Sequence, residues 1–547
     1  TSLTLDGRGG GLLESQRNYG VTLLNGSQVG GSVLGEVEIN GTGGSSQGGS
    51  NWGVGIGHKN QDGISTMVTS GGGNVRIDGK GGGTGEAESN FGVIVYEGAI
   101  VQSGGLGRVA LTGEGGHADG DTNIGVYVVN DQAMVTTNGG DVIIDGVGGG
   151  TGNSGYNTGV VISAAKIVGA QQTSVSVTGN GGSSSGLANS GIELAHAGTL
   201  IDVEDGDMNL LGAGGAGMGG HNHGVFLHAD DTGDLKVQST GKGNIEIDGV
   251  GNGVGGSSSG VVLTGAGVGV TAAEGDIKLT GAGTHLVSSG TSRGVIMSSG
   301  SNVVGAKIVV EGNGGLGQDT GSIGVLITGA GTGFTTTESL SVVGQGGGSG
   351  VTSFKNHGVR LERGSQVTAL GEATVTLTGV GGYGDVGSHH GVFIDHALDT
   401  VPPTTVSAAR GEITINGNGG GGQDSTSNRG IQISEGAVIT SSESADIVLN
   451  GIGGLGKGGH NHGVLISDSG VNQNAATINT DAGLLRISGQ GGNGYDSSYN
   501  YGVAIAGLDI RGETVDLSGT GGVSTGDHNY GVSINGHSKS TVVDATT

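Results

Sequence analysis

The chain has 547 residues, of which 132 are glycine, two are proline and none is cysteine. So much glycine excludes a helical protein, because each glycine inside a helix costs ~1 kcal/mol relative to alanine, and the absence of cysteine excludes disulfides and thiolate metal sites. The formal net charge of −27, with only 21 Lys and Arg, disfavours nucleic acids and anionic membranes as partners.

The first predicted strand of each repeat is an aliphatic-x-aliphatic triplet, usually followed by a polar residue and then a glycine, as in Val37–Ile39 before Gly41. Alternation directs the two aliphatic side chains to one face and the central residue to the other. We therefore expect these central residues to face solvent: Glu38, Arg76, Glu246, Lys278, Arg486 and Asp516. The motif occurs sixteen times, with its glycine at Gly7, Gly41, Gly79, Gly113, Gly146, Gly179, Gly212, Gly249, Gly281, Gly312, Gly344, Gly379, Gly417, Gly451, Gly489 and Gly519.

The second predicted strand begins at the motif Asn-x-Gly-aliphatic-x-aliphatic, whose glycine lies 11 to 14 residues after the first glycine. It also occurs sixteen times, from Gly20 to Gly531, so the mean period is 34 residues. A third, looser β-prone run such as Ile100–Gln102 closes most repeats. The alternate aliphatic positions of the second strand should be buried, for example Val54, Ile56, Val93, Val95, Val392 and Ile394.

Three short strands in each of about sixteen repeats predict an all-β protein, a right-handed parallel β-helix (β-solenoid) with rungs of ~34 residues. A propeller of four-stranded blades is the alternative for repeats of this length, and sixteen blades would require two domains. No linker or change of composition divides the chain. The sequence therefore predicts one continuous solenoid over 1–547, and we expect it to be a segment of a longer repetitive chain.

The position two residues before the second glycine is asparagine in twelve repeats. Stacked in register, such amides can hydrogen-bond to their copies in the next rung. We interpret them as a structural ladder of Asn18, Asn51, Asn90, Asn123, Asn157, Asn189, Asn222, Asn356, Asn428, Asn461, Asn500 and Asn529.

Aromatic rings recur at the residue between this asparagine and the glycine. Exposed rings there could stack on glycans or on a partner, and we assign this role to Tyr19, Trp52 and Phe91; rings that point inward would instead fill the core. The same position later carries His223, His357, His390, His462, Tyr501 and Tyr530. Zinc sites need four ligands, which these histidines do not supply, so we predict no metal site among them.

Aspartates recur in the loops between the two motifs, including Asp119, Asp121, Asp319, Asp424, Asp496 and Asp527. Neighbouring rungs could share a calcium ion between such carboxylates. The nonapeptide repeat of calcium-binding β-rolls is absent, and aspartate is an ordinary turn residue. We therefore predict no cofactor, with calcium as the only ion left open.

The central residue of the second strand is mostly apolar, unlike that of the first. Because it should point away from the core, we expect a contiguous outer patch, and such patches mark interaction sites. We interpret it as a self-association face, the alternative being that a loop of the same chain covers it. Its members are Ile94, Tyr127, Val161, Phe226, Val262, Ile296, Leu326, Phe393 and Leu465.

The pattern Val-x-Ile-Asp-Gly-x-Gly-Gly followed by Asn-x-Gly-Val-x-Ile resembles the repeats of large bacterial surface proteins, namely filamentous-haemagglutinin-like and autotransporter-type β-strand-repeat adhesins. The resemblance covers the whole chain and rests on repeat style, so no functional residue is carried over. It implies a right-handed β-helix, export to the cell surface, and a role in adhesion, aggregation or sheath formation.

These observations predict an extracellular structural or adhesive protein of a bacterial cell surface, a fibre, sheath or adhesin stalk with no enzymatic activity. Its expected partners are other copies of itself and cell-surface glycans, without nucleic acid and without a membrane span. The alternative is a polysaccharide-acting β-helix enzyme, a lyase or glycosidase, which would need facing carboxylates in a cleft.

Overall fold

The computed structural model consists of parallel β-strands joined by turns and loops, and its described residues contain no α-helix. Consequently, no helix in the described ranges is long and apolar enough to cross a membrane. The chain divides into two compact units, Thr1–Ile277 and Lys278–Thr547; one continuous domain over 1–547 stays a prediction. The structure describes residues 2–31, 34–130, 132–229, 233–287, 290–318, 321–396, 401–468, 475–536 and 540–545.

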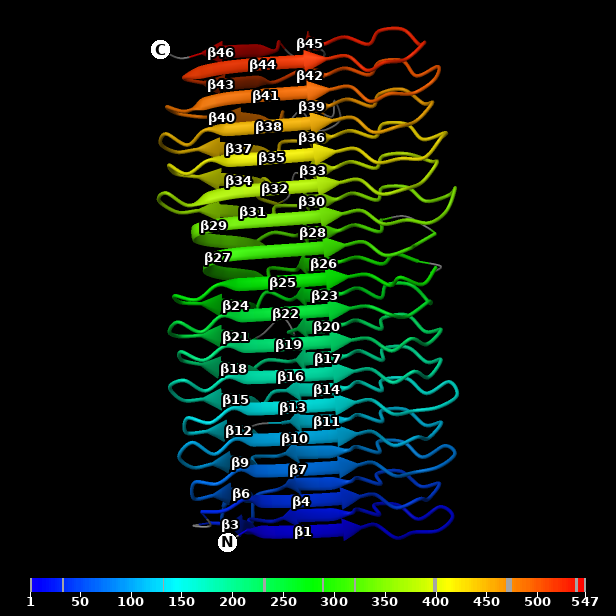
Figure 1. Cartoon of the computed structure of the whole chain (residues 1–547), viewed down its shortest axis with the longest axis vertical. Coiled ribbons are helices and arrows are strands. Elements are labelled where there is room, and N and C mark those ends of the chain that lie inside the picture. Colours follow the sequence, from blue (N-terminus) through cyan, green and yellow to red (C-terminus); the bar gives the residue numbers. More distant parts are fainter. Residues whose placement is uncertain are drawn as a thin grey trace. The chain divides into compact units, whose positions relative to one another are not determined.

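Each unit contains eight repeats, and each repeat forms one turn of a solenoid with three strands (Figure 1). Every strand pairs in parallel with its copy one turn later, for example with Val37 opposite Val75 and Gly41 opposite Gly79. The second strands form one sheet, and the first and third strands belong to another. The predicted parallel β-solenoid with three strands per turn is therefore confirmed.

In the first unit, the three strands of a turn are short and differ little from one repeat to the next. The first strands are β1 (Leu3–Arg8), β4 (Val37–Thr42), β7 (Val75–Lys80), β10 (Val109–Glu114), β13 (Val142–Val147), β16 (Val175–Asn180), β19 (Met208–Ala213) and β22 (Ile245–Val250). The second strands are β2 (Val21–Leu24), β5 (Val54–Gly57), β8 (Val93–Tyr96), β11 (Val126–Val129), β14 (Val160–Ser163), β17 (Ile192–Ala195), β20 (Val225–His228) and β23 (Val261–Thr264). The third strands are β3 (Gln28–Gly30), β6 (Met67–Ser70), β9 (Ile100–Ser103), β12 (Met134–Thr137), β15 (Lys166–Gly169), β18 (Leu200–Val203), β21 (Leu235–Ser239) and β24 (Val268–Ala272).

In the second unit, two third strands continue without a break into the following first strand, which gives the long strands β27 (Asn302–Asn313) and β29 (Gly333–Gln345). The other first strands are β25 (Ile277–Ala282), β32 (Thr374–Val380), β35 (Ile413–Asn418), β38 (Ile447–Ile452), β41 (Leu484–Gln490) and β44 (Thr514–Thr520). The second strands are β26 (Val295–Ser298), β28 (Val325–Thr328), β30 (Val359–Glu362), β33 (Val392–Ile394), β36 (Ile431–Ser434), β39 (Val464–Ser467), β42 (Val503–Ala506) and β45 (Val532–Asn535). The other third strands are β31 (Gln366–Ala369), β34 (Thr405–Ala408), β37 (Val438–Ser441), β40 (Thr477–Asn479), β43 (Asp509–Gly512) and β46 (Val542–Ala545).

The core of each unit is formed by the alternate aliphatic residues of these strands. Val54, Ile56, Val392 and Ile394 are fully buried, as predicted. The six charged residues at the centre of the first strands are exposed or partly exposed, and none of them is buried. This register avoids the large cost of placing an unpaired charge in an apolar interior.

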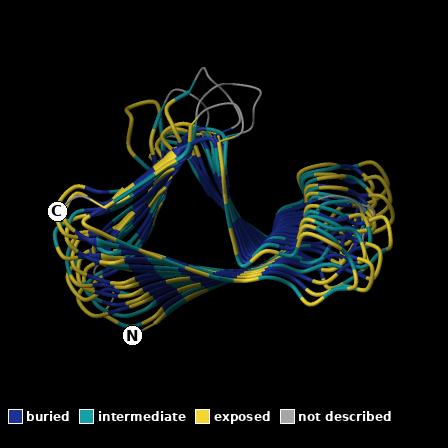
Figure 2. Cartoon of the chain, turned by 90° about the horizontal axis from the view of Figure 1, so that it is seen from above, coloured by how far each residue is buried: buried dark blue, intermediate teal, exposed yellow. Residues whose placement is uncertain are grey.

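Glycine lines a narrow waist in every turn. A Cβ atom added to Gly41 would lie 2.1 Å from the carbonyl oxygen of Gly53, and the other first-motif glycines meet the second-motif glycine of their own turn at 2.0 to 2.2 Å. The first and second strands therefore touch backbone to backbone. Beyond the waist they separate into a loop lobe, while on the other side they enclose the aliphatic core (Figure 2). Close backbone approach thus explains why both motifs contain glycine.

Candidate functional site

The predicted asparagine ladder lies in the loop lobe and runs from turn to turn. In the first unit, the side-chain amide Nδ2 of Asn51 donates to Oδ1 of Asn90 at 3.0 Å, and Nδ2 of Asn90 donates to Oδ1 of Asn123 at 2.8 Å. The same amides also donate within their own turn, as Asn51 does to the carbonyl oxygen of Gly48 at 2.6 Å. Each asparagine therefore closes its own loop and holds the next one in register.

The ladder continues in the second unit, where Ser292, Ser322 and His389 stand in place of asparagine. The backbone N–H of Asn428 donates to Oδ1 of Asn461 at 2.9 Å, and Nδ2 of Asn500 donates to Oδ1 of Asn529 at 3.0 Å. His389 replaces asparagine in one turn, and its backbone N–H donates to Oδ1 of Asn428 at 3.1 Å. These contacts give the asparagines a structural role, and their burial leaves them unavailable to a ligand.

The nine residues expected to form an exposed self-association face do not form an open patch. They point away from the aliphatic core, yet Ile94, Val161, Val262 and Leu326 are only 4 to 7% exposed. The other five members, Tyr127, Phe226, Ile296, Phe393 and Leu465, are partly buried. We correct the expectation of a free apolar patch, because four of its members are buried and the other five are partly buried.

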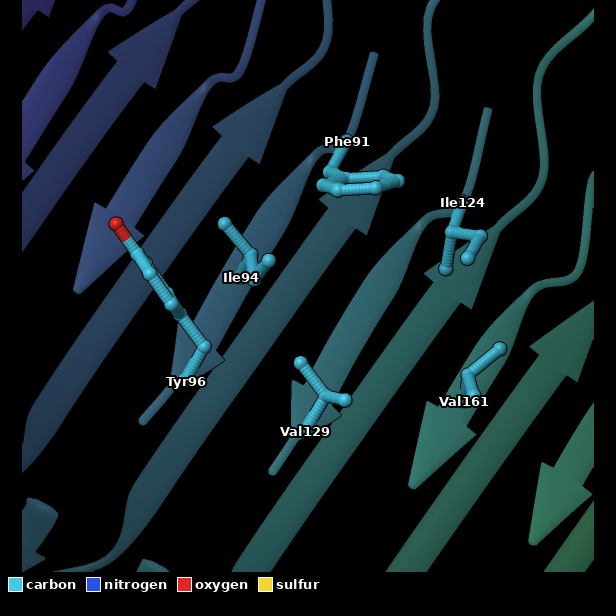
Figure 3. Packing of buried hydrophobic residues seen from close by; sticks show 6 residues of the cluster. All are labelled: Phe91, Ile94, Tyr96, Ile124, Val129 and Val161. Atoms are coloured by element: carbon cyan, nitrogen blue, oxygen red, sulfur yellow. The ribbon is translucent and has the colours of Figure 1, made fainter. Parts of the chain in front are cut away.

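In the first unit, the cover is a second hydrophobic cluster outside the solenoid core (Figure 3). Phe91, Ile94, Tyr96, Ile124, Val129 and Val161 pack together there, with Leu24, Trp52 and Tyr127 against them. Glycines in β5 leave room for the largest rings, since added Cβ atoms on Gly55 and Gly57 would meet the rings of Trp52 and Tyr96 at 2.9 and 2.2 Å. Neither a partner nor a loop is needed to bury this face.

Tyr19, Trp52 and Phe91, which we assigned to glycan stacking, stack on one another. The ring centroids of Tyr19 and Trp52 are 4.5 Å apart, and those of Trp52 and Phe91 are 5.7 Å apart. The indole N–H of Trp52 donates to the carbonyl oxygen of Ser89 at 3.0 Å. Because both faces of Trp52 are occupied by neighbouring rings, the structure favours the alternative that these residues fill a core.

Histidines at the same position in the second unit are held in one neutral tautomer. The backbone N–H of His390 donates to Nδ1 of His357, and that of Tyr501 donates to Nδ1 of His462, both at 3.2 Å. A neutral imidazole that accepts at Nδ1 carries its proton on Nε2. Burial lowers the pKa of all three histidines well below the ordinary value.

Two further histidine pairs bear on the expectation that no metal is bound. His221 and His223 have ring centroids 5.9 Å apart, as have His460 and His462. Burial lowers the pKa of His223 to about 4. Within the described ranges, no three His, Cys, Asp or Glu side chains are grouped as metal ligands. The absence of a cofactor stays a prediction.

The loop aspartates that could hold calcium accept hydrogen bonds from the next turn. The Oδ1 atom of Asp119 accepts from the hydroxyl of Thr151 at 2.6 Å, and that of Asp121 accepts from the backbone N–H of Gly155 at 2.7 Å. Asp319 lies outside the described residues. The contacts that are described fit the interpretation of these aspartates as turn residues.

A cluster of charged groups that the sequence reading missed lies at the ends of β30 and β33. The Nη2 atom of Arg360 contacts an oxygen of Glu362 at 2.5 Å and an oxygen of Asp395 at 3.6 Å, so these two oxygens are at most about 6 Å apart. Glu362 also accepts from the hydroxyl of Thr328 at 3.1 Å. The guanidinium lies 5.1 Å from the ring centroid of Phe393. The sequence does contain one indication of this cluster, because Arg360 places a charge at a position that is apolar in most repeats.

Burial raises the pKa of Asp395 to about 7; Arg360 opposes this shift, while Glu362 and Glu435 add to it and Arg363 opposes it. Both Glu362 and Asp395 are buried, at 7% and 4% exposure. Retaining glycosidases also use two neighbouring carboxyl groups, one of them with a raised pKa, but here an arginine bridges the pair and little of it reaches solvent.

Replacing Asp395 by Asn should make the protein more stable above pH 7 than the wild type. The folded state binds a proton that the unfolded chain releases near pH 4, so the contribution of Asp395 to stability is complete below pH 4 and is lost as the pH rises to about 7. At ~1.4 kcal/mol for each pKa unit, the full difference is on the order of 4 kcal/mol. Denaturant unfolding of both proteins at pH 4 and pH 8 measures it.

A matched control is the exposed carboxylate Asp424, which pairs with Lys457. Asp424→Asn should change stability by less than ~0.5 kcal/mol at either pH. A difference between Asp395→Asn and the wild type that is the same at pH 4 and pH 8 would contradict the raised pKa.

No protein-family model matches this chain, and no curated protein is similar to it in sequence. Any proposal for its function therefore depends on the sequence repeats and on the geometry of the structure.

Proposed function

We propose that this protein is an extracellular structural and adhesive β-solenoid, a stalk, fibre or sheath component of a bacterial cell surface, and that it has no enzymatic activity. The supporting observation is that the polar groups that recur along the repeats bind the neighbouring turns. The asparagine ladder, the loop aspartates and the histidine Nδ1 atoms all accept or donate between turns. These recurring residues thus hold the turns of the solenoid together, which is a structural role. Its resemblance to surface-adhesin repeats supports the same proposal.

A polysaccharide-acting enzyme is less well supported. Such an enzyme needs two carboxyl groups that reach the scissile bond. Glu362 and Asp395 lie close to each other, but both are buried and contact the same guanidinium. The pair resembles a buried ion cluster, which is retained in proteins for reasons other than net stability.

Self-association through the nine-residue column is not part of this proposal, because its members are buried or partly buried. Adhesion requires side chains that remain exposed, and in a solenoid these lie on the outer faces of the strands and in the loop lobe. Cell-surface glycans are the partners that an exposed, uncharged, hydroxyl-rich or aromatic surface suits best.

Antibodies against the folded chain should label intact producing cells without permeabilisation, and deletion of the gene should reduce attachment or aggregation without slowing growth. Complementation with the wild-type gene should restore attachment. Labelling that appears only after the cells are permeabilised, or unchanged attachment in the deletion strain, would overturn the proposal.

A further inference from the structure

Six aromatic rings form two parallel columns on three successive turns of the second unit. We call this set the double ring column. Neighbouring centroids within a column are 4.8 to 5.2 Å apart, and rings of the same turn meet nearly edge to face across the columns at 5.9 to 6.4 Å. The first column consists of His460, Tyr499 and His528, and the second of His462, Tyr501 and Tyr530.

Most of the double ring column is exposed, in contrast to Phe91 in the ring stack of the first unit: His460, Tyr499, His528 and Tyr530 are exposed and Tyr501 is partly buried, while His462 is buried. Tyr499 has a ring on each side, His460 at 5.1 Å and His528 at 4.8 Å, and is still 39% exposed. Phe91, in the first-unit stack, is 6% exposed. The outer edges of the double ring column therefore remain available to a partner after the rings have stacked on one another.

The backbone at the first column is unusual for aromatic residues. His460, Tyr499 and His528 have φ angles of 67°, 60° and 61°, in the left-handed region. This conformation is disfavoured for a residue with a Cβ atom. Equivalent turns place other residues in the same conformation, both small, such as Ser50, and large, such as Arg17 and Lys355. The left-handed turn is thus a property of the repeat, and these three turns differ in carrying a ring there on each successive turn.

The charged residues around the exposed rings limit which kinds of ligand can bind there. The loops 490–502 and 520–531, which carry Tyr499, Tyr501, His528 and Tyr530, contain no Lys or Arg. They do contain Asp496, Asp527 and serine and threonine hydroxyls, and the loop before His460 contains Lys457, which pairs with Asp424. Because the rings stack on one another, a ligand can meet only their edges and the tyrosine hydroxyls. The two aspartates would repel an acidic polysaccharide, whereas a neutral sugar can offer hydroxyls to the tyrosine hydroxyls and C–H groups to the ring edges.

The spacing of the rings suits a periodic ligand. One ring per turn at 4.8 to 5.2 Å matches the repeat of pyranose rings along an extended β-linked polysaccharide, so each turn can meet one sugar. We propose that the double ring column binds a neutral, extended β-linked polysaccharide, of the cellulose or chitin type, lying along the direction in which these turns stack. This inference rests on the proposed adhesive function and gives it a site and a ligand class.

The full chain should sediment with insoluble cellulose or chitin, and the double variant Tyr499→Ala with Tyr501→Ala should bind at least tenfold more weakly. Both substitutions remove the central ring of a column, the ring that lies between two others along the proposed path of the ligand. Depletion isotherms give the affinities. Thermal unfolding and far-ultraviolet circular dichroism verify that the variant is folded.

Tyr156→Ala is the matched control. Tyr156 occupies the equivalent position in the first unit, with φ 57° and 52% exposure. Its neighbours in the column are Thr122 and Ala188, so it belongs to no ring ladder. This variant should bind as the wild type does.

Three results would overturn the site: no binding of the wild type to either polymer, stronger binding to polygalacturonate than to both, or equal binding by the double variant and the wild type. Surface labelling and attachment of producing cells are separate measurements. If they succeed while the binding assay fails, the ligand site is wrong and the adhesive function stands.

Discussion

Replacing Gly113 by alanine is expected to destabilise the first unit by about 3–5 kcal/mol, at the upper end of single-residue effects. A Cβ atom there would lie 2.0 Å from the carbonyl oxygen of Gly125 and 2.6 Å from its carbonyl carbon. Both are backbone atoms of a neighbouring strand and cannot move aside without separating β10 from β11. Because each turn contacts only its neighbours, we expect partial unfolding around this turn.

Gly269→Ala is the matched control, because Gly269 lies within β24 and no atom lies within 4 Å of its added Cβ. Its stability should change by less than ~1 kcal/mol, and the sign should be favourable, since alanine reduces the entropy of the unfolded chain. Denaturant unfolding followed by circular dichroism compares the two variants. Equal stability of Gly113→Ala and the wild type would show that the waist is wider than described.

The waist illustrates how far the sequence predicts this fold. The spacing of Gly41, Gly53 and their copies predicts the period, the number of turns and the alternation of buried residues, because these depend on local pattern. It does not predict that the two glycines of a turn touch each other. Contact between strands that are 12 residues apart depends on the path of the loop between them, which the alternation within the strands does not indicate.

The burial of the outer face of the second strands could not be predicted from the sequence, for a different reason. Alternation correctly directs Ile94 away from the core but does not reveal what lies over it. The ring of Trp52 lies over Gly55 of its own turn, and the ring of Tyr96 lies over Gly57 of the preceding turn. Which residues bury this face therefore depends on the direction in which each large side chain points, within its turn or toward the next. A glycine in one strand paired with a large aromatic residue in the next turn would predict such covering, but only once the register between the two strands is known.

The double ring column could be predicted only in part. Tyr501 and Tyr530 follow the ladder asparagine and belong to a recognised position, whereas Tyr499 and His528 precede it. Nothing in the spacing indicates that the preceding residue adopts a left-handed conformation or that its ring faces solvent. The charged cluster at Arg360 was missed for a related reason, since its members are brought together only by pairing of β30 with β33.

Replacing Asn123 by alanine should cost about 2–4 kcal/mol, because it removes both directions of the ladder at one turn. The Nδ2 atom of Asn123 donates to Oδ1 of Asn157 at 3.1 Å and to the carbonyl oxygen of Gly120 at 2.6 Å, and its Oδ1 accepts from Asn90 at 2.8 Å. All three asparagines are fully buried. Water therefore cannot replace the lost bonds without entering the loop lobe.

Serine at the same position should restore part of this loss. In another turn of the first unit, Ser258 occupies the ladder position, is fully buried, and accepts from the backbone N–H of Asn222 at 3.2 Å. The expected order of stability is thus wild type, then Asn123→Ser, then Asn123→Ala, measured by denaturant unfolding. Asn209→Ala, an exposed asparagine at the centre of β19, should stay within ~0.5 kcal/mol of the wild type. If Asn123→Ala proved no more harmful than Asn209→Ala, the ladder would be a consequence of stacking rather than a contributor to it.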